Sequence, residues 1–151
     1  MQEQFGYAYR NLRWEMMQED SPKLTFLNVA GDWKSSPHTP IISIEQLRDL
    51  LADLSKGKPG IVNLESKVGL LQLGLGGQFA CAQFTTRDDK PRYLSAKAKA
   101  FRATTDVEFL CGNTPTPIAP ELCVSFGDAL KIAEYFFTTG GRSPDFEWVE
   151  V

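Results

Sequence analysis

The sequence predicts an α+β fold in which two main helices pack on an antiparallel sheet. Two amphipathic helical patterns lie far apart in the chain, and short apolar runs bounded by Gly and Pro lie between them. Runs of strands flanked by isolated helices are typical of this class. The chain has 151 residues, the length of one domain, so we expect residues 1–151 to form a single domain with residues 1–20 as a peripheral extension.

The first helix is predicted from Ser43 to Leu54. Ser43 can cap it, and Gln46 three residues later completes a capping box that satisfies backbone N–H groups at the helix start. Gly57 and Pro59 end the helix. Between these signals, apolar residues recur at helical spacing: Ile44, Leu47, Leu50, Leu51 and Leu54.

Strands are predicted on both sides of this helix. Residues 24–30 form a short run of β-formers, and residues 35–40 are expected to be a loop that contains Pro and Ser. Farther on, two apolar runs surround Gly76-Gly77 and predict a β-hairpin, because the central residues of such turns have positive φ. Shorter strands are expected at 92–95 and 107–111.

The second helix is predicted from Ser125 to Gly140, after a Pro-rich connector at residues 114–120. Ser125 can cap the helix, and Asp128 places an anion near its N-terminus, where the helix dipole favours one. Gly140 falls where a left-handed C-cap is expected. One face of the helix is apolar: Phe126, Ala129, Leu130, Ala133, Phe136 and Phe137. Residues 145–151 alternate enough to form a final strand.

The sequence lacks the residue patterns of the common catalysts. His38 is the only histidine, so a histidine base or triad would depend on it. The three cysteines, Cys81, Cys111 and Cys123, have no zinc spacing, and their odd number favours buried reduced thiols. The glycines near residue 76 lack the spacing and the lysine of a nucleotide loop. We therefore expect no catalytic residue, no metal and no cofactor, although two carboxylates that meet across a cleft stay open as an alternative.

Charge is unevenly divided along the chain, whose net charge is −3. Residues 1–102 carry a net +3 and residues 103–151 a net −6, and the stretch 87–102 holds six basic residues and two acids. Such polarity permits a negative face that steers a basic partner, and a solvated surface without any partner is equally compatible with it. We expect the basic stretch to be a solvated hairpin edge that binds no nucleic acid directly. The candidate partner-binding residues are the acids Asp106, Glu108, Glu121, Asp145, Glu147 and Glu150.

Neither a membrane segment nor a secretory signal is predicted. No apolar run approaches the roughly 20 residues that span a bilayer. The first twenty residues interleave charges with aromatic side chains and contain no apolar core of a signal peptide. Together with the reduced thiols, these features predict a cytoplasmic protein with no membrane partner.

The segment from Gly127 to Trp148 resembles the C-terminal signature of immunity protein family 1 of bacterial polymorphic toxin systems. That signature is a helix ending in paired aromatics and a Gly, then a short turn with Pro, then a Trp in a terminal strand. The matching residues are Ala129, Phe136, Phe137, Gly140, Pro144 and Trp148. The hairpin and the first helix agree with the family in their order. The turn before Pro144 is one residue longer than the commoner Gly-x-x-Pro form.

The resemblance implies a bacterial immunity protein that binds a cognate toxin domain, often a nucleic-acid deaminase or nuclease, and occludes its active site. If the toxin has a basic cleft, the acids of residues 103–151 could imitate phosphates. On strand geometry Asp145 and Glu147 would share one face, with Glu150 on the other. Phe136, Phe137 and Trp148 are expected in the core. A small enzyme with a cross-cleft carboxylate pair and a non-catalytic adaptor domain are the alternatives, and the sequence leaves open whether the chain forms a homo-oligomer.

Overall fold

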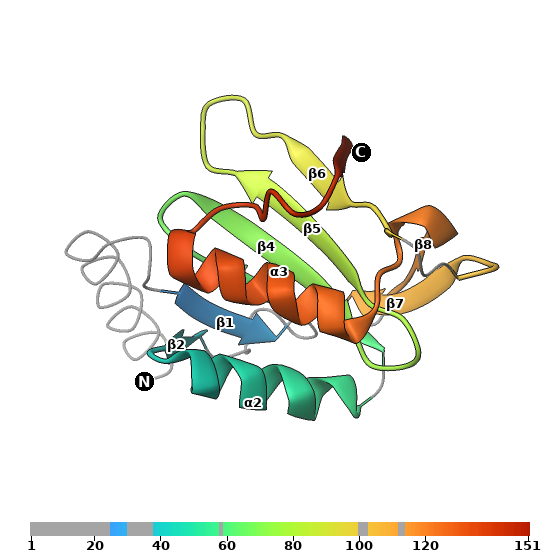
Figure 1. The fold of residues 1–151 in the computed structure, drawn as a ribbon, viewed down its shortest axis with the longest axis horizontal. Coiled ribbons are helices and arrows are strands. Elements are labelled where there is room, and N and C mark those ends of the chain that lie inside the picture. The colour runs from blue at the N-terminus through green and yellow to red at the C-terminus, as the bar shows by residue number, and fades with distance from the viewer. Residues whose placement is uncertain (1–24, 30–37, 58, 100–102, 112–113) are drawn as a thin grey trace.

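The protein is described by a computed structural model that covers residues 25–29, 38–57, 59–99, 103–111 and 114–151, with only the backbone described at 25–29, 38, 39 and 111. It confirms the α+β class, with two helices packed on one sheet (Figure 1). The sheet follows the order β2-β1-β3-β4-β5-β6-β9, with β7 beside β3 and β8 beside β7. The elements are β1 (Thr25–Val29), β2 (His38–Ile41), α2 (Ile44–Ser55), β3 (Gly60–Glu65), β4 (Gly69–Leu75), β5 (Cys81–Thr86), β6 (Tyr93–Ala96), β7 (Val107–Cys111), β8 (Thr114–Ile118), the 3-10 helix η1 (Pro120–Leu122), α3 (Phe126–Thr139) and β9 (Trp148–Glu150).

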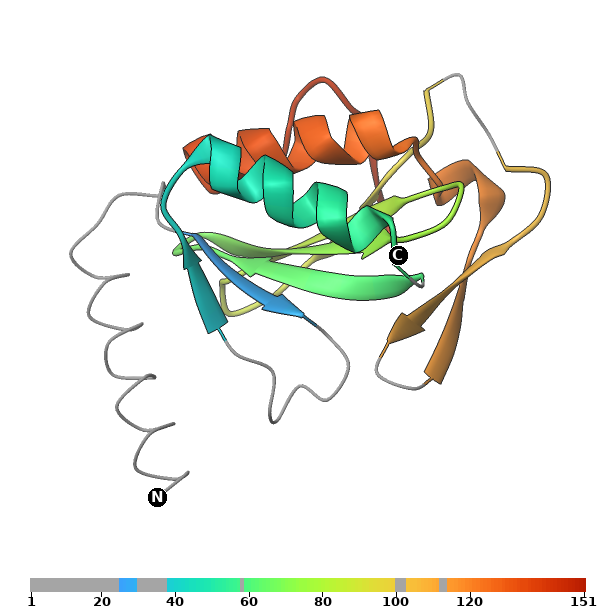
Figure 2. The same ribbon diagram turned by 90° about the horizontal axis from the view of Figure 1, so that it is seen from below.

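The sheet is mixed, so the prediction of a wholly antiparallel sheet is wrong at one pairing. β7 joins β3 in parallel at Gly60↔Leu110, where the N–H of Leu110 donates to the carbonyl of Pro59 at 3.0 Å. β1 already occupies that side of β3 from Val62 to Glu65, so β7 reaches only the start of the strand. The sheet curls into a half-barrel, with both helices on one side and the β7–β8 hairpin extending away from them (Figure 2).

The main core lies between the helices and the sheet. Alternate strand residues face the helices, as the two-residue period of a strand requires. They meet Leu47 and Leu51 of α2 and the apolar face of α3. The strand residues of this core include Val62, Leu64, Leu71, Leu73, Leu75, Ala82, Phe84, Leu94 and Ala96. A second, smaller cluster attaches the β7–β8 hairpin on the other side of the sheet and contains Ile61, Cys81, Ala103, Phe109, Ile118 and Cys123.

Both helices begin and end within one residue of the predicted bounds. The hydroxyl of Ser43 accepts the N–H of Gln46 at 3.1 Å, and the hydroxyl of Ser125 accepts that of Asp128 at the same distance. Gln46 departs from the expected capping box, because its Oε1 accepts from the N–H of Ile42 at 2.8 Å, one residue before the cap. Gly140 ends α3 in the left-handed conformation, with φ of 80°. Capping signals are local in sequence, which is why they predicted these ends.

Three segments differ from their predicted structure. Residues 38–40, expected in a loop, belong to β2, and residues 35–37 of that loop lie outside the described residues. Residues 114–118, expected as a connector, form the strand β8, which pairs with β7. The last strand covers only Trp148–Glu150, because Asp145 lies in a turn where its N–H donates to the hydroxyl of Ser143 at 3.2 Å. The proposed extension at residues 1–20 is also outside the described part of the chain.

The predicted hairpin at Gly76-Gly77 is confirmed, with φ of 93° and 104° at the two glycines. Its connection is longer than a tight turn, because the last paired residues of the ladder are Gly74 and Cys81. Gly74 serves a different purpose from the turn glycines. A Cβ placed there would lie 2.5 Å from the Sγ of Cys81 and 2.8 Å from the ring of Phe109. The absent side chain lets the second cluster approach the sheet.

Gly69, at the start of β4, allows a similar approach on the helix side. A Cβ at Gly69 would lie 2.4 Å from Cζ of Phe84 and 3.0 Å from the carbonyl oxygen of Thr85. The ring of Phe84 then meets Phe136 of α3 edge-on, with 6.3 Å between ring centroids. Gly69 therefore sets how α3 sits on the sheet.

We predict that Gly69→Ala destabilises the protein by about 1–3 kcal/mol, because Phe84 must leave its position against Phe136. The matched control is Gly127→Ala in the first turn of α3, where the nearest atom to an added Cβ is 3.9 Å away. That change should stabilise by about 0.5–1 kcal/mol through the lower entropy of the unfolded chain. Urea unfolding of both variants measures the two effects, and an equal shift in both would contradict the explanation.

Candidate partner-binding surface

The six residues of the C-terminal signature are mostly structural. Ala129 and Phe136 are fully buried, and Phe137 and Trp148 are half-buried and packed against the main core. The indole Nε1 of Trp148 donates to the carbonyl oxygen of Ser143 at 2.9 Å, which closes the turn before β9. Pro144 in that turn is exposed. The expected core role is confirmed for Phe136, while Phe137 and Trp148 lie at the margin of the core.

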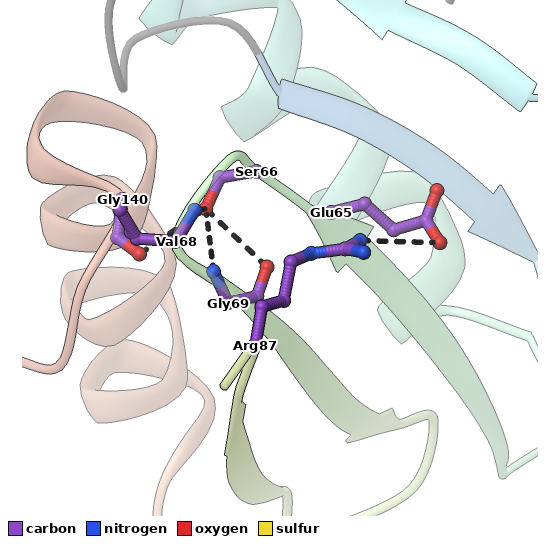
Figure 3. A network of polar contacts seen from close by, with 6 residues as sticks. All are labelled: Glu65, Ser66, Val68, Gly69, Arg87 and Gly140. Atoms are coloured by element: carbon purple, nitrogen blue, oxygen red, sulfur yellow. Dashed lines mark hydrogen bonds and ion pairs between the residues drawn. The ribbon is translucent and has the colours of Figure 1, made fainter. Parts of the chain in front are cut away.

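Ser66, which the sequence analysis did not single out, ties Gly140 to the turn between β3 and β4 (Figure 3). It is fully buried, and its Oγ lies 3.2 Å from the carbonyl oxygen of Gly140 and 3.3 Å from that of Gly69. The same Oγ accepts the N–H groups of Val68 and Gly69, each at 3.3 Å. This hydroxyl supplies a partner to the last carbonyls of α3, which the helix leaves unsatisfied. Its position in a short turn between two apolar runs was the only signal in the sequence.

The six candidate acids are all exposed, and they form two groups. Asp106, Glu108 and Glu121 belong to the region of β7 and η1, and none of them has an ion-pair partner among the described residues. Burial raises the pKa of the Cys123 thiol, and the nearby carboxylates of Asp106 and then Glu121 raise that pKa further. Both carboxylates therefore lie near the same thiol.

The second group of acids lies beside the basic stretch, because β9 pairs with β6. Glu147 and Lys97 form an ion pair at 3.7 Å, and Glu150 and Arg92 form another at 3.8 Å. Two acids of the C-terminal part of the chain are thus paired with two cations of the basic stretch. The prediction of a solvated edge at the basic stretch is wrong, since β6 is paired on both sides, with β5 and β9. Asp145 lies in the turn before β9, so it does not share a strand face with Glu147 as the sequence predicted.

The sheet face opposite the helices, here called the open face, carries two rows of side chains that strand register brings together. The strand residues that face the helices alternate with these residues, so the rows point the other way. The first row is Asn63, Gln72, Gln83 and Ser95, in direct register across β3, β4, β5 and β6. The second row is Glu65, Leu70, Thr85 and Tyr93. No motif marks these residues, and only the register joins them.

Two polar atoms of the first row are buried without a hydrogen-bond partner, the Oδ1 of Asn63 and the Oγ of Ser95. Ser95 is fully buried, whereas Tyr93 in the second row is 53% exposed. Buried polar atoms without a partner are rare in folded proteins. The open face therefore combines partly exposed amide side chains with an exposed aromatic ring.

Cys81 and Cys123 are buried and form no disulfide, as predicted. The side chain of Cys111 is not among those that the structure describes. Burial raises the pKa of Cys81 from 9.0 to about 12. Within the described ranges, no three or more His, Cys, Asp or Glu side chains converge as they would around a metal ion. Neither described helix has the length and apolar character needed to cross a membrane.

The raised pKa of Cys81 predicts a loss of stability in alkaline solution. Below about pH 9 the thiol is protonated in the folded and the unfolded chain, so its contribution is fully present; as pH rises toward about 12, only the unfolded chain releases the proton. Raising the pH from about 8 to about 10 should cost the wild type roughly 1 kcal/mol more in unfolding free energy than it costs Cys81→Ala. Equal losses in both proteins would show that this thiol ionises in the folded state.

Comparison with known families finds a match to the family described as immunity protein Imm1, over residues 32–150. The matched range includes α2, α3 and every strand from β2 to β9. It also contains the open face, the Ser66–Gly140 contact and all six candidate acids. A search of curated proteins finds no significant match.

Proposed function

Because the chain belongs to the immunity protein Imm1 family, we propose that it binds a cognate bacterial toxin domain in the cytoplasm and neutralises it by covering its active site. The observation that carries this proposal is the family match, which spans almost all of the described fold. The protein would act stoichiometrically as an inhibitor, with no turnover of its own. Neither alternative from the sequence, an enzyme with a carboxylate pair or an adaptor, is favoured by a specific arrangement of the described side chains.

We further propose that the toxin acts on nucleic acid, as a deaminase or a nuclease, and that the acids of this chain assist its capture. An enzyme that binds nucleic acid needs a positively charged cleft, because phosphate contacts dominate its affinity. Asp106, Glu108 and Glu121 fit this cleft best, since they are exposed and have no ion-pair partner in the described chain. The carboxylates of Glu147 and Glu150 are already balanced by Lys97 and Arg92, so they add less to the field.

The proposed function is tested with the C-terminal domain encoded by the neighbouring open reading frame as the toxin. Co-expression of this chain should restore the growth of cells that produce the active domain. A purified toxin domain with an inactivating active-site substitution should form a one-to-one complex with it. Purified chain should show no hydrolase, transferase or deaminase turnover by itself. Absence of both complex and protection, or a turnover that one carboxylate substitution abolishes, would overturn the proposal.

The role of the acids is tested by two double charge reversals that change the net charge equally. Asp106→Lys with Glu121→Lys should lower the association rate constant roughly tenfold at low salt, and by less at moderate salt, because screening weakens electrostatic steering. Glu147→Lys with Glu150→Lys should change it less, since those charges are paired in the wild type. Stopped-flow binding at two salt concentrations measures both. A larger effect of the second variant would place the steering surface beside β9 instead.

A further inference from the structure

We propose that the open face is the surface on which the partner protein docks, and that it recognises an uncharged, hydrogen-bonding part of that protein. This inference rests on the proposed function and adds the location and the chemistry of the contact. The acids near β7 would then steer the encounter, while the open face holds the complex. The two roles predict different kinetic effects, so they can be separated.

The first row of the open face supplies hydrogen bonds without charge. Asn63, Gln72 and Gln83 lie in direct register on three adjacent strands, and all three side chains are partly exposed. Each amide offers two N–H donors and one acceptor oxygen. Neighbouring strands are about 4.8 Å apart, so the three amides form a line of closely spaced groups that can each donate and accept. Such a line is complementary to peptide groups and to amide or hydroxyl side chains.

Two polar atoms of this row have no hydrogen-bond partner within the described part of the chain. The Oγ of Ser95 and the Oδ1 of Asn63 are buried and have no hydrogen-bond partner. Ser95 lies between Gln83 and Val149 in the register of the sheet, at the end of the amide row. A docked protein can reach the side chain of half-buried Asn63, whereas the Oγ of fully buried Ser95 lies beneath the surface.

Among the residues that the structure describes, two pairs of opposite charges lie at the two ends of this face. Glu65 and Arg87 lie 3.7 Å apart at one end, and Lys97 and Glu147 lie 3.7 Å apart at the other (Figure 3 shows the first pair). A nucleic acid would require cations that are free to meet phosphates. A lipid surface would require an apolar face flanked by basic residues. A polar, neutral face with paired charges fits a protein partner instead.

Tyr93 is the best anchor for that partner. Its side chain is 53% exposed, and Val151, which is 57% exposed, lies next to it through an N–H to carbonyl hydrogen bond of 2.9 Å. Leu70 and Thr85 of the same row extend the contact toward the middle of the sheet. Tyrosine is enriched among the residues that dominate protein interfaces, because it combines a large apolar ring with a polar end.

The acids that we propose to steer the toxin lie beside this face. The second cluster joins Ile61 and Cys81, which continue the open side of the sheet, to Phe109 of β7. The β7–β8 hairpin extends away from the helices (Figure 2), and strand alternation places the amide row on that same side of the sheet. Asp106 and Glu108 are at this hairpin, so a toxin drawn to them meets the open face next.

The test measures binding kinetics with the inactivated toxin domain as the probe. Tyr93→Ala combined with Gln83→Ala should raise the dissociation rate constant by roughly tenfold or more and leave the association rate constant within about twofold. The matched control is Tyr135→Ala on α3, another partly exposed tyrosine, on the helix side, which should change neither constant. Gln72→Glu keeps the side-chain shape and adds an unpaired charge to the row, so it should weaken binding while the melting temperature stays the same.

The outcomes separate this inference from the proposed function. If the wild type binds but only Tyr135→Ala weakens the complex, the open face is not the docking surface and the immunity function stands. If the wild type forms no complex with the toxin domain, the proposed function fails and this inference fails with it. Tyr93-dependent binding of a fluorescent single-stranded oligonucleotide or of an anionic vesicle would overturn the protein partner.

Discussion

The close approach of Phe84 to Gly69 is the constraint on which the helix layer depends. With no side chain at Gly69, the ring of Phe84 lies over β4 and meets Phe136 edge-on. Phe136 fixes the last turns of α3, which end at Gly140 in the left-handed conformation. The Gly140 carbonyl then faces the hydroxyl of Ser66, which also binds the backbone of Gly69. Each of these contacts joins the start of β4 to the end of α3, so the two segments position each other.

The parts of the fold that the sequence predicted are those whose signals are local. The caps at Ser43 and Ser125 and the left-handed Gly140 each depend on a few neighbouring residues, and all three are confirmed. The parallel pairing of β7 with β3 depends on residues far apart in the chain, for which no short pattern exists. The same limit applies to the candidate surface. The acids could be identified in the sequence. The ion pairs that balance the charges of Glu147 and Glu150 with Lys97 and Arg92 depend on the pairing of β6 with β9.

The aromatic residues of the C-terminal signature and the residues proposed to meet the partner lie on opposite sides of the sheet. Phe136, Phe137 and Trp148 pack on the helix side, where they hold the fold together. The amide row alternates with core residues on the same strands and faces the other way. Substitution in this row would leave the core intact, so one scaffold can serve partners of different surface chemistry. Fold and specificity are then encoded by alternate positions of the same strands.

The two prolines of β8 bear on how the protein behaves when no partner is present. Pro115 and Pro117 are two residues apart, so both remove N–H donors from the same edge of the strand. β8 pairs with β7 over five residues. The edge of β8 that lacks the two N–H donors is therefore the outer edge, which faces away from β7. Another chain could not complete a ladder along that edge, and edge-to-edge growth into aggregates is blocked there. The two prolines therefore disfavour polymerisation of copies through β8, whatever the protein concentration.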